Sequence, residues 1–139
     1  MKIDIVTREE YATKTYKPVI IHDNGTIDLY DISDSECTEI KAMSVIGKFK
    51  NENLRDSLNN LIKKLRIGGT LIISETDCNI VCRQLLSGSL SEENFNKIIS
   101  NKNSLPSLRY VAEVLKSNGL KIKTQRLNGL DYQIVASRG

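Results

Sequence analysis

The chain has 139 residues, of which 40% are hydrophobic and 27% are charged, and its formal net charge is +3. This composition is ordinary for a soluble globular protein, and the length predicts a single domain spanning residues 1–139. No segment approaches the ~20 apolar residues of a membrane span, the N-terminus lacks the apolar stretch of a signal peptide, and the charge is too small to indicate nucleic-acid binding.

The N-terminal residues predict short strands. Lys2–Thr7 alternates apolar and polar side chains and is a candidate edge strand, whereas residues 8–17 are expected to form a loop or a short helix. Two β-rich runs, 18–22 and 26–30, flank Asn24-Gly25. Because both turn residues tolerate positive φ, this arrangement predicts a β-hairpin.

The middle of the chain has the pattern of strand, helix and strand. Thr38–Val45 is a short β-rich run. Apolar residues from Leu54 to Leu65 recur at helical spacing, and Gly68-Gly69 is expected to end that helix, because glycine adopts the left-handed conformation common at helix C-termini. Thr70–Ile73 has no polar alternation, which is typical of a parallel strand buried on both faces.

Three helices and a hairpin are predicted for the remaining residues. Asn79–Leu86 suits a short helix, and Ser91 and Ser107 stand where N-caps would begin the next two helices. The final β-rich runs, 120–127 and 131–137, are separated by an Asn-Gly turn and predict a closing antiparallel hairpin.

The three cysteines and the single histidine do not form a recognisable site. Cys37, Cys78 and Cys82 make no CxxC pair, and their odd number favours buried free thiols in a reducing compartment, so we expect a cytoplasmic protein without a zinc site. His22 stands beside the Asn-Gly turn, where a solvated side chain is the simpler interpretation. Its pairing with Cys37 or Cys78 stays open, although the spacing does not support it.

Charged residues offer two further candidates. Basic side chains are densest at Lys63, Lys64 and Arg66 and again within 116–123, and solvated helix and strand edges explain them more simply than a nucleic-acid surface. Glu75 and Asp77 follow the predicted buried strand, at the strand end where ligands bind in α/β sheets. The same two carboxylates are also ordinary as loop residues or helix N-caps.

Four segments of the chain are similar in sequence to segments of one enzyme family. Leu65-Arg66-Ile67-Gly68-Gly69 is similar to an LKPGG segment, and 38–49 to a DEIYASHVLEHF segment, of class I S-adenosylmethionine-dependent methyltransferases. Residues 82–96 and 119–137 also resemble family elements. The resemblance implies an α/β fold: a truncated Rossmann-like methyltransferase fold, with a mostly parallel sheet, helices on both faces and a C-terminal antiparallel hairpin.

The cofactor loop of that family has no counterpart in this sequence. The family holds S-adenosylmethionine over a glycine-rich turn after the first strand, where close backbone approach leaves no room for side chains. The chain has no GxGxG motif, and residues 1–27, read as atypical strands, replace that unit. By the resemblance, Asp31 stands where the family places an acidic residue against the adenine amino group, while a surface turn aspartate is the simpler interpretation.

Two functional hypotheses follow. The first is a degenerate, truncated methyltransferase-like domain, a pseudoenzyme without cofactor or catalysis that serves in binding, assembly or structure. The alternative is an active S-adenosylmethionine-dependent methyltransferase with an altered or partner-completed site, in which Asp31, Glu75 and Asp77 are the cofactor-binding candidates and no catalytic residue is identified. Because an uncovered sheet edge invites pairing, we expect a homo-oligomer such as a dimer, or a protein partner.

Overall fold

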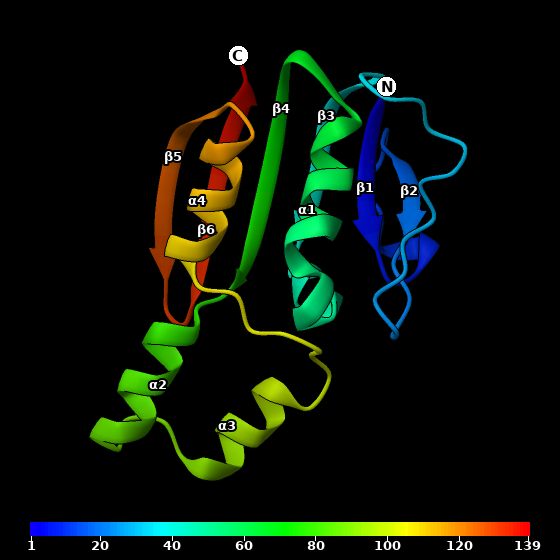
Figure 1. Ribbon diagram of the computed structural model, residues 1–139. Helices are drawn as coiled ribbons and strands as arrows, with labels where there is room; N and C mark the ends of the chain where they lie inside the picture. Colours follow the sequence, from blue (N-terminus) through cyan, green and yellow to red (C-terminus); the bar gives the residue numbers. More distant parts are fainter.

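The computed structural model describes residues 1–139, in which one mixed sheet of six strands is flanked by helices (Figure 1). The strands are β1 (Lys2–Val6), β2 (Lys17–Ile20), β3 (Cys37–Met43), β4 (Leu65–Thr76), β5 (Leu120–Asn128) and β6 (Asp131–Arg138). The α-helices are α1 (Leu54–Lys63), α2 (Cys78–Ser87), α3 (Glu92–Ile99) and α4 (Leu108–Ser117). Short 3₁₀ helices are η1 (Glu9–Tyr11), η2 (Ile46–Lys48) and η3 (Asn51–Asn53). None of the helices combines the length and hydrophobicity that a membrane span requires.

The strands lie in the order β2-β1-β3-β4-β6-β5. The first four in this order run parallel to one another, whereas β6 is antiparallel to both β4 and β5. The predicted fold class, a truncated Rossmann-like sheet that is mostly parallel and closes with an antiparallel hairpin, is confirmed.

The N-terminal strands differ from their predicted arrangement. β1 lies between β2 and β3 and is not an edge strand. The predicted hairpin is confirmed only next to its turn, where Ile21 and Ile27 form an antiparallel bridge and the Asp28 N–H donates to the Ile20 carbonyl at 3.1 Å. Further from the turn the arms do not pair, and residues 17–20 pair in parallel with β1. The turn itself closes through the Gly25 N–H, which donates to the His22 carbonyl at 2.9 Å. The local residues therefore determine the turn, while pairing with β1, a tertiary contact, determines the strand direction.

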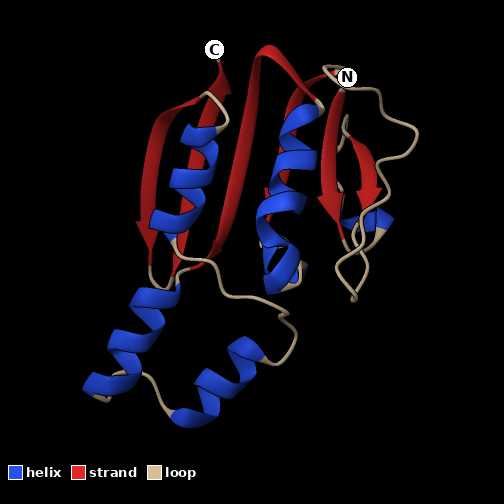
Figure 2. Ribbon diagram, in the orientation of Figure 1, coloured by secondary structure: helices blue, strands red, loops and turns tan.

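Helices α1 and α4 lie side by side on one face of the sheet (Figure 2). Each buries an apolar stripe at helical spacing, formed by Leu54, Leu58, Leu61 and Ile62 in α1 and by Val111, Ala112, Val114 and Leu115 in α4. The stripes pack on inward-facing strand residues such as Leu71 and Ile73, within one hydrophobic cluster of 27 residues. This amphipathic packing is what holds the two helices on the sheet.

The opposite face, which we call the open face, carries no α-helix. Only residues 7–16, including η1, fold back over β1 there: the Thr13 N–H donates to Oδ2 of Asp4 at 2.7 Å, and Lys41 donates to the Thr13 hydroxyl at 3.0 Å. Helices were expected on both faces, but α2 and α3 lie beyond the carboxyl edge of the sheet (Figure 1). Ile72, expected to be buried, is in consequence only half-buried.

The Gly68-Gly69 pair lies within β4 and does not end α1. The helix already stops at Lys63, and β4 pairs with β3 at Leu65 before residues 66–69 leave the register. Gly68 has φ +84°, and a Cβ on Gly69 would lie 2.7 Å from the Leu65 side chain. The two glycines therefore permit a tight bulge, and the expected C-cap is wrong.

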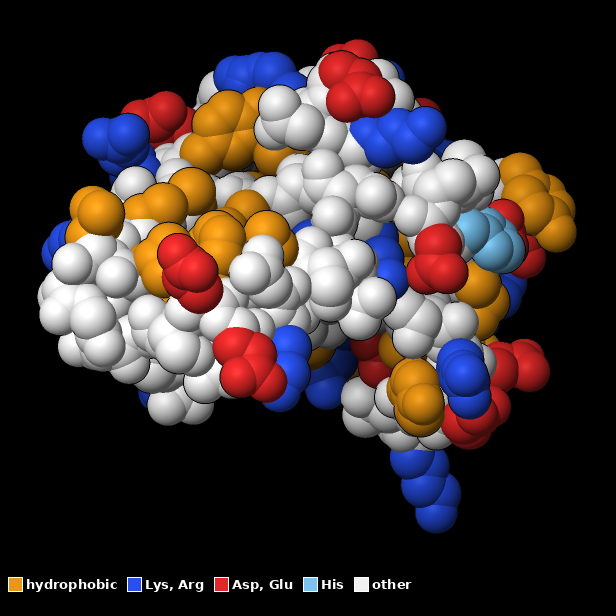
Figure 3. Space-filling model, turned by 90° about the horizontal axis from the view of Figure 1, so that it is seen from below, with side chains coloured by type: hydrophobic (Ala, Val, Ile, Leu, Met, Phe, Trp, Pro, Cys, Tyr) orange, Lys and Arg blue, Asp and Glu red, His pale blue; other side chains and the backbone are white.

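The predicted helix starts of the C-terminal half are confirmed. The hydroxyl of Ser91 accepts the Asn94 N–H at 3.1 Å, and the hydroxyl of Ser107 accepts the Tyr110 N–H at 3.1 Å. α2 and α3 pack mainly on each other, and Figure 3 shows hydrophobic side chains gathered over this pair. Leu86, at the end of α2, is 87% exposed.

Truncation of the α1 stripe tests its role in stability. Leu58 is fully buried, so Leu58→Ala is expected to lower the free energy of unfolding by about 2–5 kcal/mol through lost transfer energy and a residual cavity. Asn60→Ala, an exposed position on the same helix, is the matched control and should change it by less than about 0.5 kcal/mol. Urea denaturation of both variants measures the difference, and equal effects would contradict the packing described.

Candidate functional site

The sheet has a topological switch point between β1 and β3. After β1 the chain moves to β2 on one side and then returns to β3 on the other. In open α/β sheets the carboxyl ends of two such strands form the ligand crevice. A cavity of about 270 Å³ lies there, lined by Asp4, Ile5, Val6, Thr7, Tyr11, Thr13, Met43, Ser44 and Val45. This cavity is the candidate ligand site of the fold.

The segment after β1 shapes that cavity. Residues 7–16 contain no glycine, and two of their side chains, Tyr11 and Thr13, belong to the lining. Asp4, only 5% exposed, holds the segment through the Thr13 N–H. Side chains therefore stand where a glycine-rich turn would leave the backbone open to a ligand.

Glu75 ends β4 and is 1% exposed. Its Oε2 accepts the Gly47 N–H at 2.9 Å, and its Oε1 accepts from both the Thr76 N–H at 3.0 Å and the Lys102 ammonium. A Cβ on Gly47 would lie 3.1 Å from Oε2, so the small residue permits this close approach. The carboxylate is fully engaged by the chain itself.

Residues 102–104 complete this network and had no signal in the sequence. The N–H groups of Asn103 and Ser104 both donate to the Gly47 carbonyl, at 2.7 and 3.0 Å. The Asn103 amide also donates to the carbonyls of Asp23 and Lys48, each at 2.7 Å. The segment between α3 and α4 is thereby fastened across the carboxyl edge, through partners far apart in sequence.

Asp77 serves as a helix cap. It is 6% exposed, and its Oδ1 accepts the Asn79 N–H at 3.3 Å at the start of α2 and the Leu108 N–H at 3.4 Å at the start of α4. Nearby, the buried Tyr132 hydroxyl donates to the Pro106 carbonyl at 3.0 Å. Burial, with the charges of Glu75 and Asp77, raises the pKa of Tyr132, which keeps this hydroxyl protonated as a donor.

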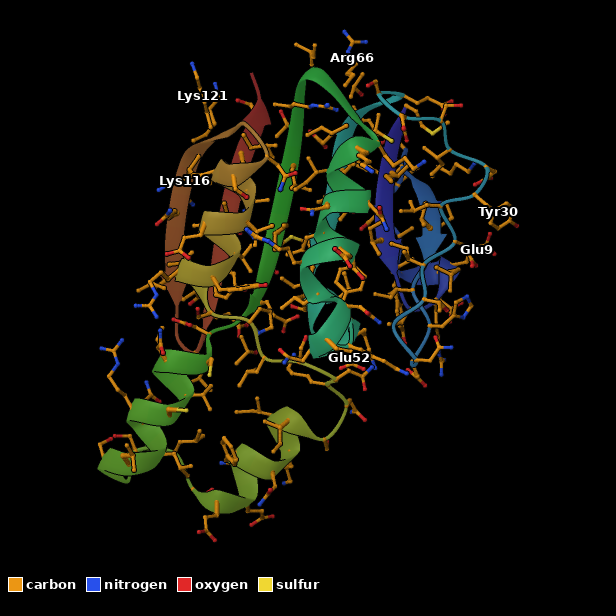
Figure 4. The ribbon with its side chains drawn as sticks, in the orientation of Figure 1. Glu9, Tyr30, Glu52, Arg66, Lys116 and Lys121 are labelled. Carbon is orange, nitrogen blue, oxygen red and sulfur yellow. The ribbon has the colours of Figure 1, made fainter.

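Asp31 lies apart from Glu75 and Asp77. It is exposed and pairs at 2.9 Å with Lys17, the first residue of β2, whose hydrogen bond lowers the pKa of Asp31. Because Lys17 stands beside the start of β1, this pair lies toward the amino edge of the sheet. Figure 4 shows the adjacent Tyr30 projecting from the side of the molecule. The structure thus brings two of the three cofactor candidates together and separates the third.

The histidine and the cysteines do not meet. His22 contacts Asp28 at 3.1 Å on the surface, and Cys37 is buried, which raises the pKa of its thiol. Cys78 is half-buried and Cys82 is exposed, both on α2, so the expectation that all three thiols are buried holds only for Cys37. No Cys-His nucleophile pair is formed.

Two other surface features lie away from the switch point. Within the basic group at the end of α1, Lys64 pairs with Asp34 at 3.0 Å, and Arg66 extends alone at the amino edge (Figure 4). The largest cavity, about 460 Å³, lies between the loop at 24–27 and the flank of α1. Its lining is Asn24, Gly25, Thr26, Ile27, Lys50, Asn53, Asp56, Ser57 and Asn60, with one hydrophobic residue.

The network at Glu75 can be tested by a double-mutant cycle. Glu75→Gln leaves the Lys102 ammonium, 18% exposed, without a carboxylate, and is expected to lower the free energy of unfolding by about 2–4 kcal/mol. The double variant Glu75→Gln/Lys102→Met should be less destabilised than the sum of the single variants by about 1–3 kcal/mol, as measured by urea denaturation. The exposed pair Glu93–Lys97 provides the control, with coupling below about 0.5 kcal/mol. Additive effects at Glu75 and Lys102 would contradict the network.

Neither a protein-family model nor a curated protein matches the sequence. Among solved structures, a protein from Pyrococcus horikoshii matches with a TM-score of 0.65 and 12% identity, covering 100% of this chain and 72% of its own. An O-methyltransferase family protein from Burkholderia thailandensis matches with a TM-score of 0.61 and 18% identity, and the match covers 81% of this chain and 33% of that protein. A Haloferax volcanii methyltransferase, solved in complex with a methyltransferase activator, matches with a TM-score of 0.59 and 11% identity. This match covers 91% of this chain and 63% of that one. The chain therefore spans only a third to three quarters of these structures, and it has the fold of class I S-adenosylmethionine-dependent methyltransferases.

Proposed function

We propose that this chain is a methyltransferase-like domain that has lost S-adenosylmethionine binding and catalysis and serves in binding or assembly in the cytoplasm. A fold by itself does not license an activity, so the proposal rests on the site. The observation that carries it is the segment after β1, where residues 7–16 put side chains and no glycine against the switch-point cavity.

The cavity is a poor fit for the cofactor that the fold implies. Its volume of about 270 Å³ lies below the roughly 300–1,000 Å³ of pockets that enclose drug-sized ligands. The hydrogen bond between Asp4 and the Thr13 N–H uses a buried carboxylate to hold the segment in place. A nucleoside would have to displace this segment, with its internal hydrogen bonds, before it could reach the ends of the strands.

The carboxylates expected to bind the cofactor have other partners. Glu75 accepts hydrogen bonds from three groups of the chain, and Asp77 caps two helices. Asp31 is paired with Lys17 toward the opposite edge of the sheet. A ligand hydroxyl at Glu75 would therefore compete with a buried internal network, which supports a structural role for both strand-end carboxylates.

The alternative function is an active methyltransferase whose cofactor site is altered or completed by a partner. One observation favours it: the cavity is still at the switch point, and it includes Tyr11, 61% exposed. The Tyr11 ring could stack on a purine, although the Arg8 guanidinium lies 6.0 Å from its centroid. The Haloferax volcanii methyltransferase in complex with an activator shows that the fold can associate with a second protein. In this alternative the partner would supply what residues 7–16 lack.

Titration with S-adenosylhomocysteine separates the two functions. We expect no heat in calorimetry and no change in Tm at millimolar ligand, where even weak binding to the native state would stabilise it by mass action. Saturable binding that Tyr11→Ala weakens would contradict the proposal and assign the ligand to the switch-point cavity. Asp31→Ala, at the amino side of the sheet, serves as the matched variant outside that cavity.

A further inference from the structure

We propose that the open face is the interface of a symmetric homodimer, in which two copies pack face to face about a twofold axis parallel to the strands and between β4 and β6. The inference rests on the assembly role proposed above and names its partner, a second copy of this chain. The surface involved comprises the outward side chains of β3, β4, β6 and β5.

The open face is available because no helix covers these four strands, and residues 7–16 reach only as far as Lys41 and Met43 on β3. Their outward residues are half-buried or exposed: Glu39, Lys41, Met43, Thr70, Ile72, Ser74, Gln133, Val135, Ser137, Lys121, Thr124 and Arg126. Parallel sheets in α/β proteins are normally covered on both faces. Ile72 and Val135 form an apolar pair at the centre of this surface, and Met43 lies in the next row on β3. Contact with a partner would remove these side chains from water.

The two sheet edges are less suited to pairing than the open face. The outer strand β5 has a register shift between Ile122 and Thr124 and exposes Lys123 and Arg126. β2, at the other edge, has four residues and includes Pro18. Bulges, lysines, prolines and short edge strands all oppose edge-to-edge pairing. We therefore assign the oligomerisation that was expected at an uncovered sheet edge to the open face instead.

Strand register makes the open face self-complementary. One row across the sheet reads Glu39, Thr70, Ser137, Lys121, and the next reads Lys41, Ile72, Val135, Thr124. A twofold axis along the strands, between β4 and β6, reverses each row against its copy. It therefore sets Glu39 opposite Lys121 of the second copy, and Ile72 opposite its Val135. Opposite charges thus meet in the first row and apolar side chains meet at the centre, while Lys41 faces Thr124 and Met43 faces Arg126 of the second copy.

The same pattern disfavours the other symmetric arrangement. An axis perpendicular to the strands would stack β5 on β5 with its direction reversed, setting Lys121 against Arg126 of the second copy. Like charges brought together in this way are repulsive. The charges therefore select the axis direction.

Glu39 and Lys121 have no ion-pair partner within the chain. Lys121 is exposed at the start of β5 (Figure 4), and the stem of its side chain lies beside Gly139. Both side chains are thus free to pair between copies, without first breaking an internal contact.

The size of the surface predicts a reversible dimer. Four strands about 4.8 Å apart and about seven residues long span roughly 19 by 23 Å, or about 440 Å² of plane per copy. Two copies bury about 900 Å², near the roughly 1,000 Å² expected of a specific interface. Side-chain relief adds to this area, and dissociation at low concentration is expected.

Charge reversal provides the test. By sedimentation velocity from micromolar to millimolar concentration, the wild type is expected to show a monomer–dimer equilibrium. Glu39→Lys and Lys121→Glu should each weaken the dimer at least about tenfold by opposing like charges. The double variant Glu39→Lys/Lys121→Glu restores the opposite pair and should regain most of the affinity. Glu113→Lys, an exposed position on α4 at the covered face, makes the same charge change as a control.

Three results would overturn the inference: a wild type that stays monomeric at millimolar concentration, an equal loss in Glu39→Lys and Glu113→Lys, or a double variant no tighter than the single ones. Circular dichroism of each variant establishes that it is folded. Titration of the same samples with S-adenosylhomocysteine keeps the two proposals distinct. A monomer that binds no ligand overturns the dimer alone, whereas a dimer that binds ligand supports the interface and overturns the loss of cofactor binding.

Discussion

The buried carboxylate of Glu75 is the interaction on which the carboxyl edge of this protein depends. It joins the end of β4 to η2 through the Gly47 N–H and to the segment before α4 through Lys102. A charge taken out of water is tolerated only where several donors surround it, and here three groups of the chain do so. Asn103 and Ser104 then bind the Gly47 carbonyl, so one charge organises three segments that are distant in sequence.

This network lies at the edge where ligands generally bind in open α/β sheets. In an open α/β sheet, polar groups at the strand ends are the natural ligand contacts. Here the carboxylates of Glu75 and Asp77 are buried: Glu75 binds groups of the chain, and Asp77 caps both α2 and α4. Residues 7–16 lie across the end of β1. The internal hydrogen bonds of Glu75 and Asp77 therefore engage the strand-end carboxylates that a ligand at this edge would have to contact. Stability and binding compete for the same groups.

The sheet is also unequal in its two faces. One face is buried under α1 and α4, while the other is covered only over β1 and the adjacent part of β3 by the segment containing η1. Strands β4 and β6 accordingly alternate buried and half-buried residues, a pattern more usual for a sheet with one solvated face. The edges carry a bulge, charges and a proline, which oppose edge-to-edge pairing, and this is the reason for proposing the open face as the dimer interface.

Local residue patterns were sufficient to predict most elements of the protein. The spacing of Leu54, Leu58 and Leu61, the caps at Ser91 and Ser107, and the closing hairpin depend on neighbours within a few residues, and all three predictions are confirmed. The order of family-like segments indicated the fold for the same reason, since each segment encodes its own element. Strand direction at 17–20 and the position of β1 in the sheet were not predictable in this way.

Only the tertiary structure decided the site. Whether Glu75 and Asp77 face a ligand or the chain depends on Gly47, Lys102 and Leu108, which lie 27 to 31 positions away and have no local pattern linking them. The separation of Asp31 from those carboxylates follows from the pairing of β2 with β1. The open face has no helix because α2 and α3 lie beyond the carboxyl edge of the sheet. The sequence by itself determined the helices, turns and caps, because these are contacts between near neighbours. The partners of each buried charge and the exposed face of the sheet were decided by long-range packing, which no short stretch of sequence records.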